Sequence, residues 1–115
     1  MSDNLFEQRD IVLVSLDPVI GHEQKGVRPA VIVSAYGFHS SGMCLMCPLT
    51  QKIKNFYGDI VVEPNKENNL GKRSEILVGQ IRAVDHQRIV KKIGVISNKE
   101  LKLILSGLNV LCGTY

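Results

Sequence analysis

The sequence predicts a small domain built mainly of β-strands, arranged as a barrel with one helix at its C-terminal end. Short apolar segments follow one another at close spacing, and turn-forming residues separate them, which is typical of small barrels. The last element differs, because its apolar residues recur at helical spacing. The 115 residues suit a single domain, 1–115, which can bury a core without a disulfide or a metal.

Five to seven short strands are expected. The segments concerned are 11–16, 30–34, 43–49, 60–62, 75–84 and 91–96. The first is apolar at nearly every position, so we expect it to be buried on both faces. Pro48, within the third, indicates an edge strand or a strand end, and Gly79, within the fifth, indicates a bulge or a close backbone approach.

One helix is predicted at the C-terminal end, and its start is clearly marked. Ser97 and Glu100 have the spacing of a capping box, with Ser97 as N-cap and Glu100 at N3. Gly113 is expected to end the helix. The apolar stripe that would cover one open side of the barrel comprises Leu101, Ile104, Leu105, Leu108 and Leu111.

The net charge is +3 and is unevenly distributed along the chain. Through Glu23 there are five acidic residues and one basic residue, whereas the chain from Gln24 onward holds thirteen basic and six acidic residues. A basic surface suits a polyanion such as RNA, or an acidic protein partner, although many ordinary proteins are as basic. No apolar segment is long enough to span a membrane, and the N-terminus is unlike a signal peptide, so we expect a cytoplasmic protein.

The cysteines of the C-x-x-C pair, Cys44 and Cys47, are better explained as core residues than as a metal or redox site. The sequence has no second pair to complete a zinc site. In a strand, residues three apart point to opposite faces, so these thiols could not share a ligand. We therefore expect no metal and no cofactor. The sequence also lacks the P-loop, G-x-G-x-x-G and G-x-S-x-G motifs.

Arg28 and Thr50 are candidates for binding a phosphate. Arg28 ends a glycine-containing loop at 19–28 and precedes a proline, which restricts its backbone. Its guanidinium could bind phosphate, or stabilise the phosphorane formed when RNA is cleaved by its own 2′-OH. Thr50 ends a strand and could donate to a phosphate oxygen. The alternatives are a surface arginine paired with Glu23 or Asp17, and a turn-forming threonine.

Further residues suit an RNA site but also suit a solvated surface. His22 could act as a general acid or base, or be an ordinary loop histidine. Gln80 could hydrogen-bond a base edge or cap a turn. The loop 51–58 interleaves basic and aromatic residues, as in a groove for single-stranded nucleic acid or in a solvated basic loop. The residues that could flank such a groove are Lys52, Lys54, Lys72 and Arg73, with Phe56 and Tyr57 between them.

Four segments, in order along the chain, resemble the MazF/PemK-type toxins, the ribonuclease halves of bacterial type II toxin–antitoxin systems. They read DIVLVSLDPVIGHEQKGVRPAVIVS, GMCLMCPLTQKIK, SEILVGQIRAVDHQRIVKKIG and NKELKLILSGLNVLCG. The resemblance extends from about residue 6 to residue 113. It implies an SH3-like β-barrel with a C-terminal helix, of the MazF/Kid/CcdB type, and a homodimer.

The resemblance also implies an activity and partners. The family cleaves single-stranded RNA, mostly mRNA, at short sequences without a metal, which inhibits translation and growth. The substrate's 2′-OH attacks the phosphorus, leaving a 2′,3′-cyclic phosphate and a 5′-OH. An acidic antitoxin of the MazE/PemI type inhibits such a toxin by laying an extended tail across the RNA groove.

The family's functional residues can be carried over to matching positions. Its loop arginine falls on Arg28 and its strand-end threonine on Thr50. Some members have a histidine where His22 stands, and Gln80 matches the glutamine beside the site. Glu23 and Gln24 match the family's EQ. The expected catalytic residues are therefore Arg28, Thr50, His22 and Glu23. The expected RNA-binding residues are Gln24, Lys25, Lys52, Lys54, Phe56 and Gln80.

Two positions depart from the family pattern. Many members carry an acid just before the matching glutamine, proposed in some as the general base, but this chain has Gly79. Our hypothesis is therefore that His22 or Glu23 takes the proton. The family's R-G-D before the first strand is here Gln8-Arg9-Asp10. The alternatives are a catalytically weakened module that binds RNA or antitoxin, and a non-enzymatic gyrase poison, against which the absence of tryptophan argues.

Overall fold

The computed structural model of the chain describes residues 6–15 and 26–113. Three 3₁₀ helices lie between the main elements, η1 (Tyr36–Ser41), η2 (Val78–Gln80) and η3 (His86–Arg88). No helix in these ranges is long and apolar enough to cross a membrane. The main elements are β1 (Asp10–Ser15), β2 (Val27–Ile32), β3 (Met43–Thr50), β4 (Ile60–Val62), β5 (Ser74–Ile76), β6 (Arg82–Asp85), β7 (Ile89–Val95) and α1 (Asn98–Cys112).

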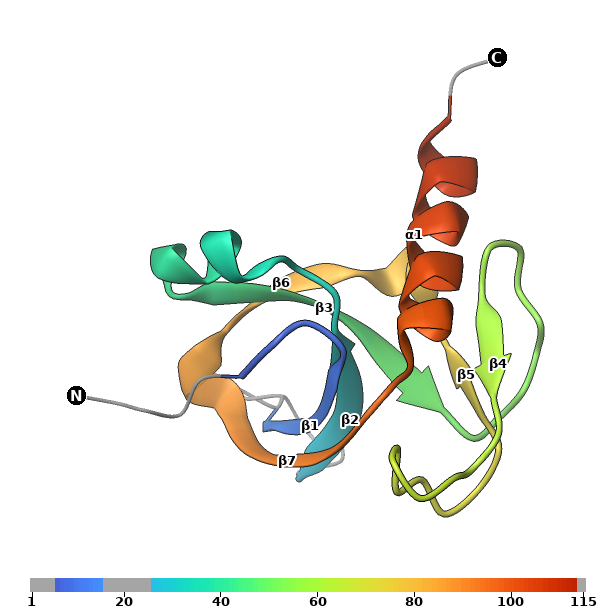
Figure 1. The fold of residues 1–115 in the computed structure, drawn as a ribbon, viewed down its shortest axis with the longest axis horizontal. Helices are drawn as coiled ribbons and strands as arrows, with labels where there is room; N and C mark the ends of the chain where they lie inside the picture. The colour runs from blue at the N-terminus through green and yellow to red at the C-terminus, as the bar shows by residue number, and fades with distance from the viewer. Residues whose placement is uncertain (1–5, 16–25, 114–115) are drawn as a thin grey trace, which may run out of the picture.

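The seven strands form one antiparallel sheet in which β3 has the most partners. The strand order is β4-β5-β3-β2-β1-β7. Strand β3 pairs with β2, with β5 and, in addition, with β6, which lies off this order. Figure 1 shows the sheet curling round, with α1 standing beside β4 and β5. The expected mainly β fold with a C-terminal helix is confirmed. The strand pairs of the described residues do not form a closed barrel, because β7 pairs with β1 and not with β6.

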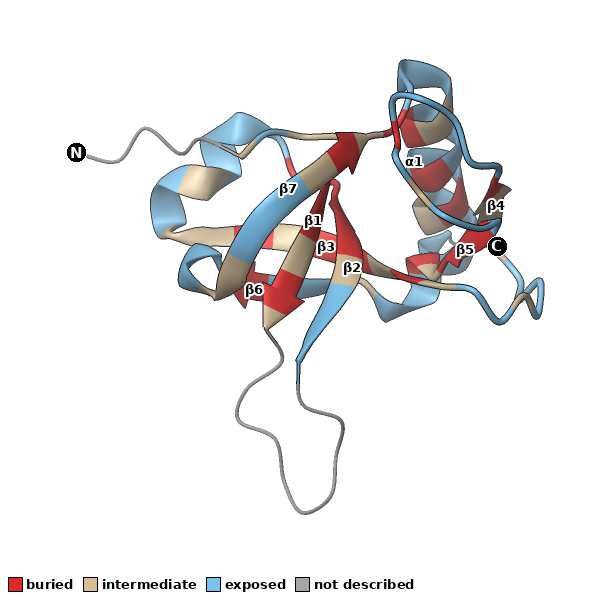
Figure 2. Cartoon of the chain, turned by 90° about the horizontal axis from the view of Figure 1, so that it is seen from below, coloured by how far each residue is buried: buried red, intermediate tan, exposed pale blue. Residues whose placement is uncertain are grey.

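Strand β1 is covered on both faces, as expected. Ile11 packs into one buried cluster, which includes Val31 of β2, whereas Val12 and Val14 pack into a second cluster. Figure 2 shows β1 and the adjoining half of β2 among the buried parts of the sheet. The two cysteines divide in the same way: Cys47 belongs to the first cluster and Cys44 to the second. They therefore lie on opposite faces of β3, as the strand periodicity predicts.

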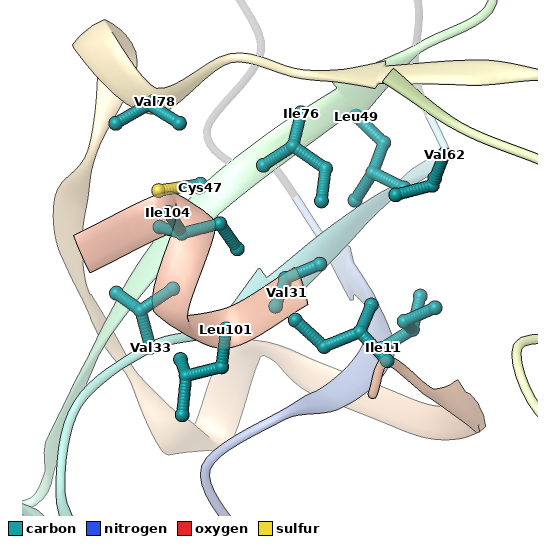
Figure 3. Packing of buried hydrophobic residues seen from close by; sticks show 11 residues of the cluster. Ile11, Val31, Val33, Cys47, Leu49, Val62, Ile76, Val78, Leu101 and Ile104 are labelled. Atoms are coloured by element: carbon teal, nitrogen blue, oxygen red, sulfur yellow. The ribbon is translucent and has the colours of Figure 1, made fainter. Parts of the chain in front are cut away.

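Helix α1 begins with the capping box that the sequence predicts. The Ser97 hydroxyl oxygen accepts from the Glu100 backbone N–H at 3.0 Å, and the Ser97 N–H donates to the Glu100 carboxylate at 2.9 Å. The helix buries Leu101 and Ile104 against the first cluster, and Figure 3 shows both side chains beside Val31 and Val33.

The expected apolar stripe of α1 is only partly correct. Leu108 is partly buried, but Leu105 and Leu111 are 43% and 38% exposed. The buried side of the helix runs instead from Leu101 through Ile104 to Gly107. Because Gly107 has no side chain, the helix comes close to Gly58 along this line, and Leu111, one turn later, lies over Gly58 and Gly79 while Leu105 stays exposed.

The expected single strand at 75–84 is wrong: β5 and β6 are separated by η2. The Leu77 N–H still continues the β3–β5 pairing by donating to the Pro48 carbonyl at 2.8 Å, and the backbone then leaves the ladder where the Val78 N–H donates to an Asp59 carboxyl oxygen at 2.8 Å. Gly79 lies in this turn and not in a bulge. Pro48 lies opposite Ala30 of β2 in a central strand and not at an edge, but it does lie near the strand end, two residues before β3 ends at Thr50. Pro48 has no N–H to donate and takes part in the sheet through its carbonyl, which accepts from Leu77.

Candidate functional site

A cleft of about 310 Å³ opens beside β2, β3, η2 and β6. Its apolar lining comprises Val14, Pro29, Ala30, Met46, Pro48, Leu49, Leu77 and Val84. Four polar side chains also line it: Arg28, Thr50, Gln80 and Arg82. The first three were expected site residues from different parts of the sequence, and the fold brings them to one place.

Arg28 is placed by a strand and not, as expected, by the end of a loop. It is the second residue of β2, because the ladder between β1 and β2 extends through Val14↔Arg28 to Ser15↔Val27. Pro29 keeps the backbone extended at this point, which is compatible with the strand. The side chain is exposed at the cleft. An arginine in this setting presents a charged fork of fixed origin, suited to a phosphate group.

Thr50 is the last residue of β3, as expected, and lies opposite Glu75 of β5. Its hydroxyl oxygen accepts from the Lys52 backbone N–H at 3.1 Å. A threonine hydroxyl has one proton to donate besides its acceptor capacity. The turn-forming and phosphate-binding interpretations of Thr50 are therefore compatible.

Arg82 is a cleft residue that the sequence analysis did not single out. It begins β6, two residues after Gln80, and lies opposite Met46 of β3. The signal was present in the Q-x-R spacing of the family segment, although Gln80 ends η2 and only Arg82 belongs to a strand. With Arg28 it gives the cleft two permanently charged guanidinium groups.

The expected RNA-binding residues of the loop 51–58 are exposed but lie outside the cleft lining. Lys52, Lys54 and Phe56 follow directly after Thr50, and Phe56 is 54% exposed. The backbone of residues 54–56 is held by Glu75, which is completely buried.

Glu75 accepts three hydrogen bonds from consecutive backbone N–H groups of this loop. Lys54 and Asn55 donate to Oε1 at 2.6 and 2.9 Å, and Phe56 donates to Oε2 at 3.0 Å. A second carboxyl group, that of Asp59, lies next to it. One Asp59 oxygen accepts from the Val78 N–H, and the other is buried without a hydrogen-bond partner if the group is a carboxylate.

The two carboxyl groups have pKa values that move apart. Burial and a hydrogen bond to Glu75 raise the pKa of Asp59 to about 6. The same hydrogen bond and the three backbone donors lower the pKa of Glu75 to about 2, against the effect of burial. A proton on Asp59 turns its otherwise unpaired carboxyl oxygen into a donor toward Glu75.

Four expected site residues lie outside the described residues: His22, Glu23, Gln24 and Lys25. At Gly79, a β-carbon would meet only the Leu111 side chain, at 3.7 Å, which is ordinary contact. The described residues contain no group of three or more His, Cys, Asp or Glu side chains that could hold a metal ion.

Comparison with known proteins links this geometry to one family. Residues 7–112 match the family model described as PemK-like, MazF-like toxin of type II toxin-antitoxin system. The chain is 39% identical over 98 residues to the endoribonuclease toxin ChpB of Escherichia coli (strain K12), covering 82% of this chain and 83% of that protein. It is 32% identical over 106 residues to the endoribonuclease toxin MazF of the same strain, covering 90% and 91%.

Solved structures share the fold. Crystals of MazF (Form-I) from Deinococcus radiodurans give a TM-score of 0.76 at 24% identity, over 97% of this chain and 100% of that one. Crystals of MazE-MazF (Form-II) from the same organism give a TM-score of 0.80 at 22% identity, over 98% and 100%.

Proposed function

Because the chain belongs to the PemK-like, MazF-like toxins of type II toxin–antitoxin systems, we propose that it is an endoribonuclease that cleaves single-stranded mRNA at a short sequence. Cleavage needs no metal and inhibits translation and growth. The observation that best supports this is the meeting of Arg28, Thr50 and Gln80 at one cleft. An apolar lining with a few polar groups at its edge suits an unstacked base with its phosphate.

The reaction is an attack by the substrate's own 2′-OH. The O2′–P bond forms, the P–O5′ bond breaks, and the products carry a 2′,3′-cyclic phosphate and a 5′-OH. Arg28 stabilises the charge that develops on the phosphorane oxygens, and the Thr50 hydroxyl donates to one of them. Gln80 and Arg82 line the same cleft and hold the neighbouring base and phosphate.

Two proton transfers complete the cleavage. We assign removal of the 2′-OH proton to His22 or Glu23, and the departing 5′ oxygen takes a proton from the protonated base or from water. His22→Ala should reduce kcat strongly, whereas cleavage that survives unchanged in both His22→Ala and Glu23→Ala would overturn this assignment.

The proposed partners follow from charge and from the family. The basic chain suits RNA and an acidic antitoxin of the MazE/PemI type. The family resemblance adds a second copy of the toxin in a cytoplasmic homodimer. Leu103, Leu105 and Val110 of α1 are exposed apolar side chains, which supports a further protein contact at the helix.

The test of this function uses a long, mostly single-stranded RNA in the presence of EDTA. The native chain, Arg28→Ala and the control Arg73→Ala are compared, and cut ends are mapped by primer extension. Arg73 is also an exposed arginine, but it pairs with Glu63 at 2.8 Å and does not line the cleft. We expect cuts at a short repeated sequence with the native chain and the control, and none with Arg28→Ala.

A second candidate function, a binding module with weakened catalysis, is favoured by Gly79. It would show salt-dependent RNA binding without cuts. That result in the same assay, with an RNA that other family members cleave, would replace the ribonuclease proposal.

A further inference from the structure

We propose that Glu75 is a positioning residue of the RNA site: its buried carboxylate holds the backbone of the loop 51–58, so that Lys52, Lys54 and Phe56 are presented to RNA beside Thr50. This inference rests on the proposed function, because it assigns those side chains to RNA. It goes beyond that function by naming a residue that touches no substrate and fixes the residues that do.

The burial and bonding of Glu75 set it apart from a chance polar residue in the core. A buried carboxylate is costly unless it is fully hydrogen-bonded. Glu75 is 0% exposed, and both of its oxygens accept N–H groups from the loop, at 2.6 to 3.0 Å. Hydrogen bonds to a charged acceptor are stronger than neutral ones. Consecutive N–H groups that converge on one anion form a nest, which here is occupied by the protein's own side chain.

The loop has an irregular backbone that needs such an anchor. Asn55, at the centre of the nest, has a φ of 54°, a left-handed conformation uncommon for residues other than glycine. Gly58 has a φ of 88°, and the Asp59 N–H donates to the Phe56 carbonyl at 3.0 Å. With the three N–H groups fixed, the side chains of Lys54 and Phe56 start from defined positions, and less conformational freedom is lost when RNA binds.

The same residue also connects the loop to the cleft. Glu75 lies opposite Thr50 in the β3–β5 ladder, and Thr50 accepts the N–H of Lys52. Strand pairing, the Thr50 hydroxyl and the buried carboxylate thus hold the loop from Lys52 to Phe56 at one end of β3.

Asp59 extends this connection to the other side of the cleft. It follows the loop, lies next to Glu75, and accepts from the Val78 N–H at 2.8 Å. Val78 begins η2, which ends at Gln80 in the cleft lining. One further titratable group in the described part of the chain interacts with the pair, the Cys47 thiol on β3. Burial and the nearby Asp59 raise the pKa of that thiol to about 12, so it stays uncharged.

The test compares Glu75→Gln with the native chain in the full-length protein. A glutamine of the same length keeps one acceptor oxygen but places an amide group where the carboxylate accepts the Phe56 N–H. The matched control is Glu63→Gln, an exposed carboxylate outside the loop and the cleft. The first readout is hydrogen exchange of the amides of residues 54–56. The second is affinity for a short single-stranded RNA in which the cleaved nucleotide carries a 2′-deoxy sugar, so that it cannot be cut. The third is the KM and kcat of cleavage of the unmodified RNA.

We expect the three loop amides to exchange about tenfold faster in Glu75→Gln, as for the loss of one charged hydrogen bond, while β1 and β2 amides stay protected. RNA affinity should fall roughly threefold to tenfold, since the loop must then be ordered on binding. KM should rise more than kcat falls. In the Glu75→Gln background, Lys54→Ala should cost less affinity than in the native chain.

Other outcomes separate this inference from the proposed function. Failure of the native chain to cut any RNA would count against the ribonuclease proposal. Hydrogen exchange of the loop amides and RNA affinity would still test the role of Glu75. Unchanged loop exchange or unchanged RNA affinity in a folded Glu75→Gln overturns the positioning role. If that variant does not fold, Asp59→Asn and Asp59→Ala decide: the asparagine, which can donate to Glu75, should keep the affinity, and equal losses in both would overturn the proposal.

Discussion

The backbone carbonyl of Gly58 lies directly against Gly107 of α1, with no room for a side chain between them. A β-carbon on Gly107 would overlap the Gly58 oxygen. On the loop side, a β-carbon on Gly58 would stand 3.0 to 3.2 Å from the Leu111 side chain of the same helix. The helix and the loop that carries Lys52 to Phe56 are therefore packed backbone to backbone.

Gly107→Ala should destabilise the protein by about 1–3 kcal/mol, although alanine is the better helix former. The added methyl group must push α1 away from Gly58, which also loosens the helix over Ile104 of the core. The measurement is urea unfolding, with Ser106→Ala as control on the exposed side of the same helix. A Gly107→Ala variant as stable as this control would show that helix and loop are not in such close contact.

The buried carboxyl pair of Glu75 and Asp59 should contribute most to the free energy of unfolding near pH 4. Glu75, with its pKa lowered from 4.5 to about 2, stabilises the fold above pH 4.5, and this stability is lost as the pH falls toward 2. Asp59, with its pKa raised from 3.8 to about 6, binds its proton better when folded. Its contribution is therefore present below pH 3.8 and is lost as the pH rises through 6.

Asp59→Asn isolates the second of these effects. The asparagine is neutral at every pH and can still donate to Glu75. We expect its free energy of unfolding to change less than that of the native chain between about pH 4 and pH 7. Parallel urea titrations at the two pH values measure the difference, with Asp85→Asn as a control at an exposed carboxylate. Equal slopes for all three proteins would contradict the proton on Asp59.

The fold could be predicted where local patterns decide it and not where a distant partner does. The burial of β1 on both faces is predicted by the neighbouring residues Ile11–Val14. The start of α1 is predicted by Ser97 and Glu100, which are three residues apart. The break between β5 and β6 was missed because it depends on the Asp59 carboxyl group accepting the Val78 N–H, a contact between residues far apart in sequence. The burial of Glu75 was missed for the same reason, since its donors lie about 20 residues earlier.

Arg9 has a left-handed backbone, with a φ of 86°, at the position where the resembling family has glycine. Its guanidinium donates to the Ile96 carbonyl at 2.9 Å, which offsets part of the strain. Arg9→Gly and Arg9→Ala both remove this hydrogen bond and differ in the β-carbon. The glycine variant should be more stable than the alanine variant by about 1 kcal/mol. Thermal unfolding of the pair measures this, and a more stable alanine variant would contradict the strained backbone.

Gly79→Asp should fold as well as the native chain. The backbone there is not left-handed, and a β-carbon would meet only Leu111 at 3.7 Å. If the proton is taken by His22, the new acid should change kcat little in the native background. In a His22→Ala background it should restore part of the activity, because an acid at this position is the one that many family members carry. Gly79→Asn provides the uncharged control. A large rise in kcat from Gly79→Asp alone would instead indicate a native enzyme weakened by its missing acid.

The candidate site was foreseeable in its residues but not in its geometry. Arg28, Thr50 and Gln80 could be named from the sequence, because their types suit a phosphate and a base and their positions match a family. That they line one cleft depends on the β2–β3–β6 pairing, which no local pattern gives. Arg82 is brought to the cleft by the pairing of β6 with β3.

Arg82→Ala should weaken the binding of single-stranded RNA and reduce its salt dependence. One fewer phosphate contact lowers the slope of log K against log salt by about 0.7 for a single strand. The cleaved nucleotide of this RNA carries a 2′-deoxy sugar, which lacks the attacking hydroxyl, so that binding is measured without cleavage. Lys66→Ala serves as the control, because Lys66 is an exposed cation in the turn after β4 and does not line the cleft. A slope that falls equally in both variants would mean that RNA binding depends on the overall charge of the protein. Arg82 would then make no phosphate contact of its own. A slope that falls only in Arg82→Ala, together with a larger loss of affinity than the control shows, supports a phosphate bound at this cleft.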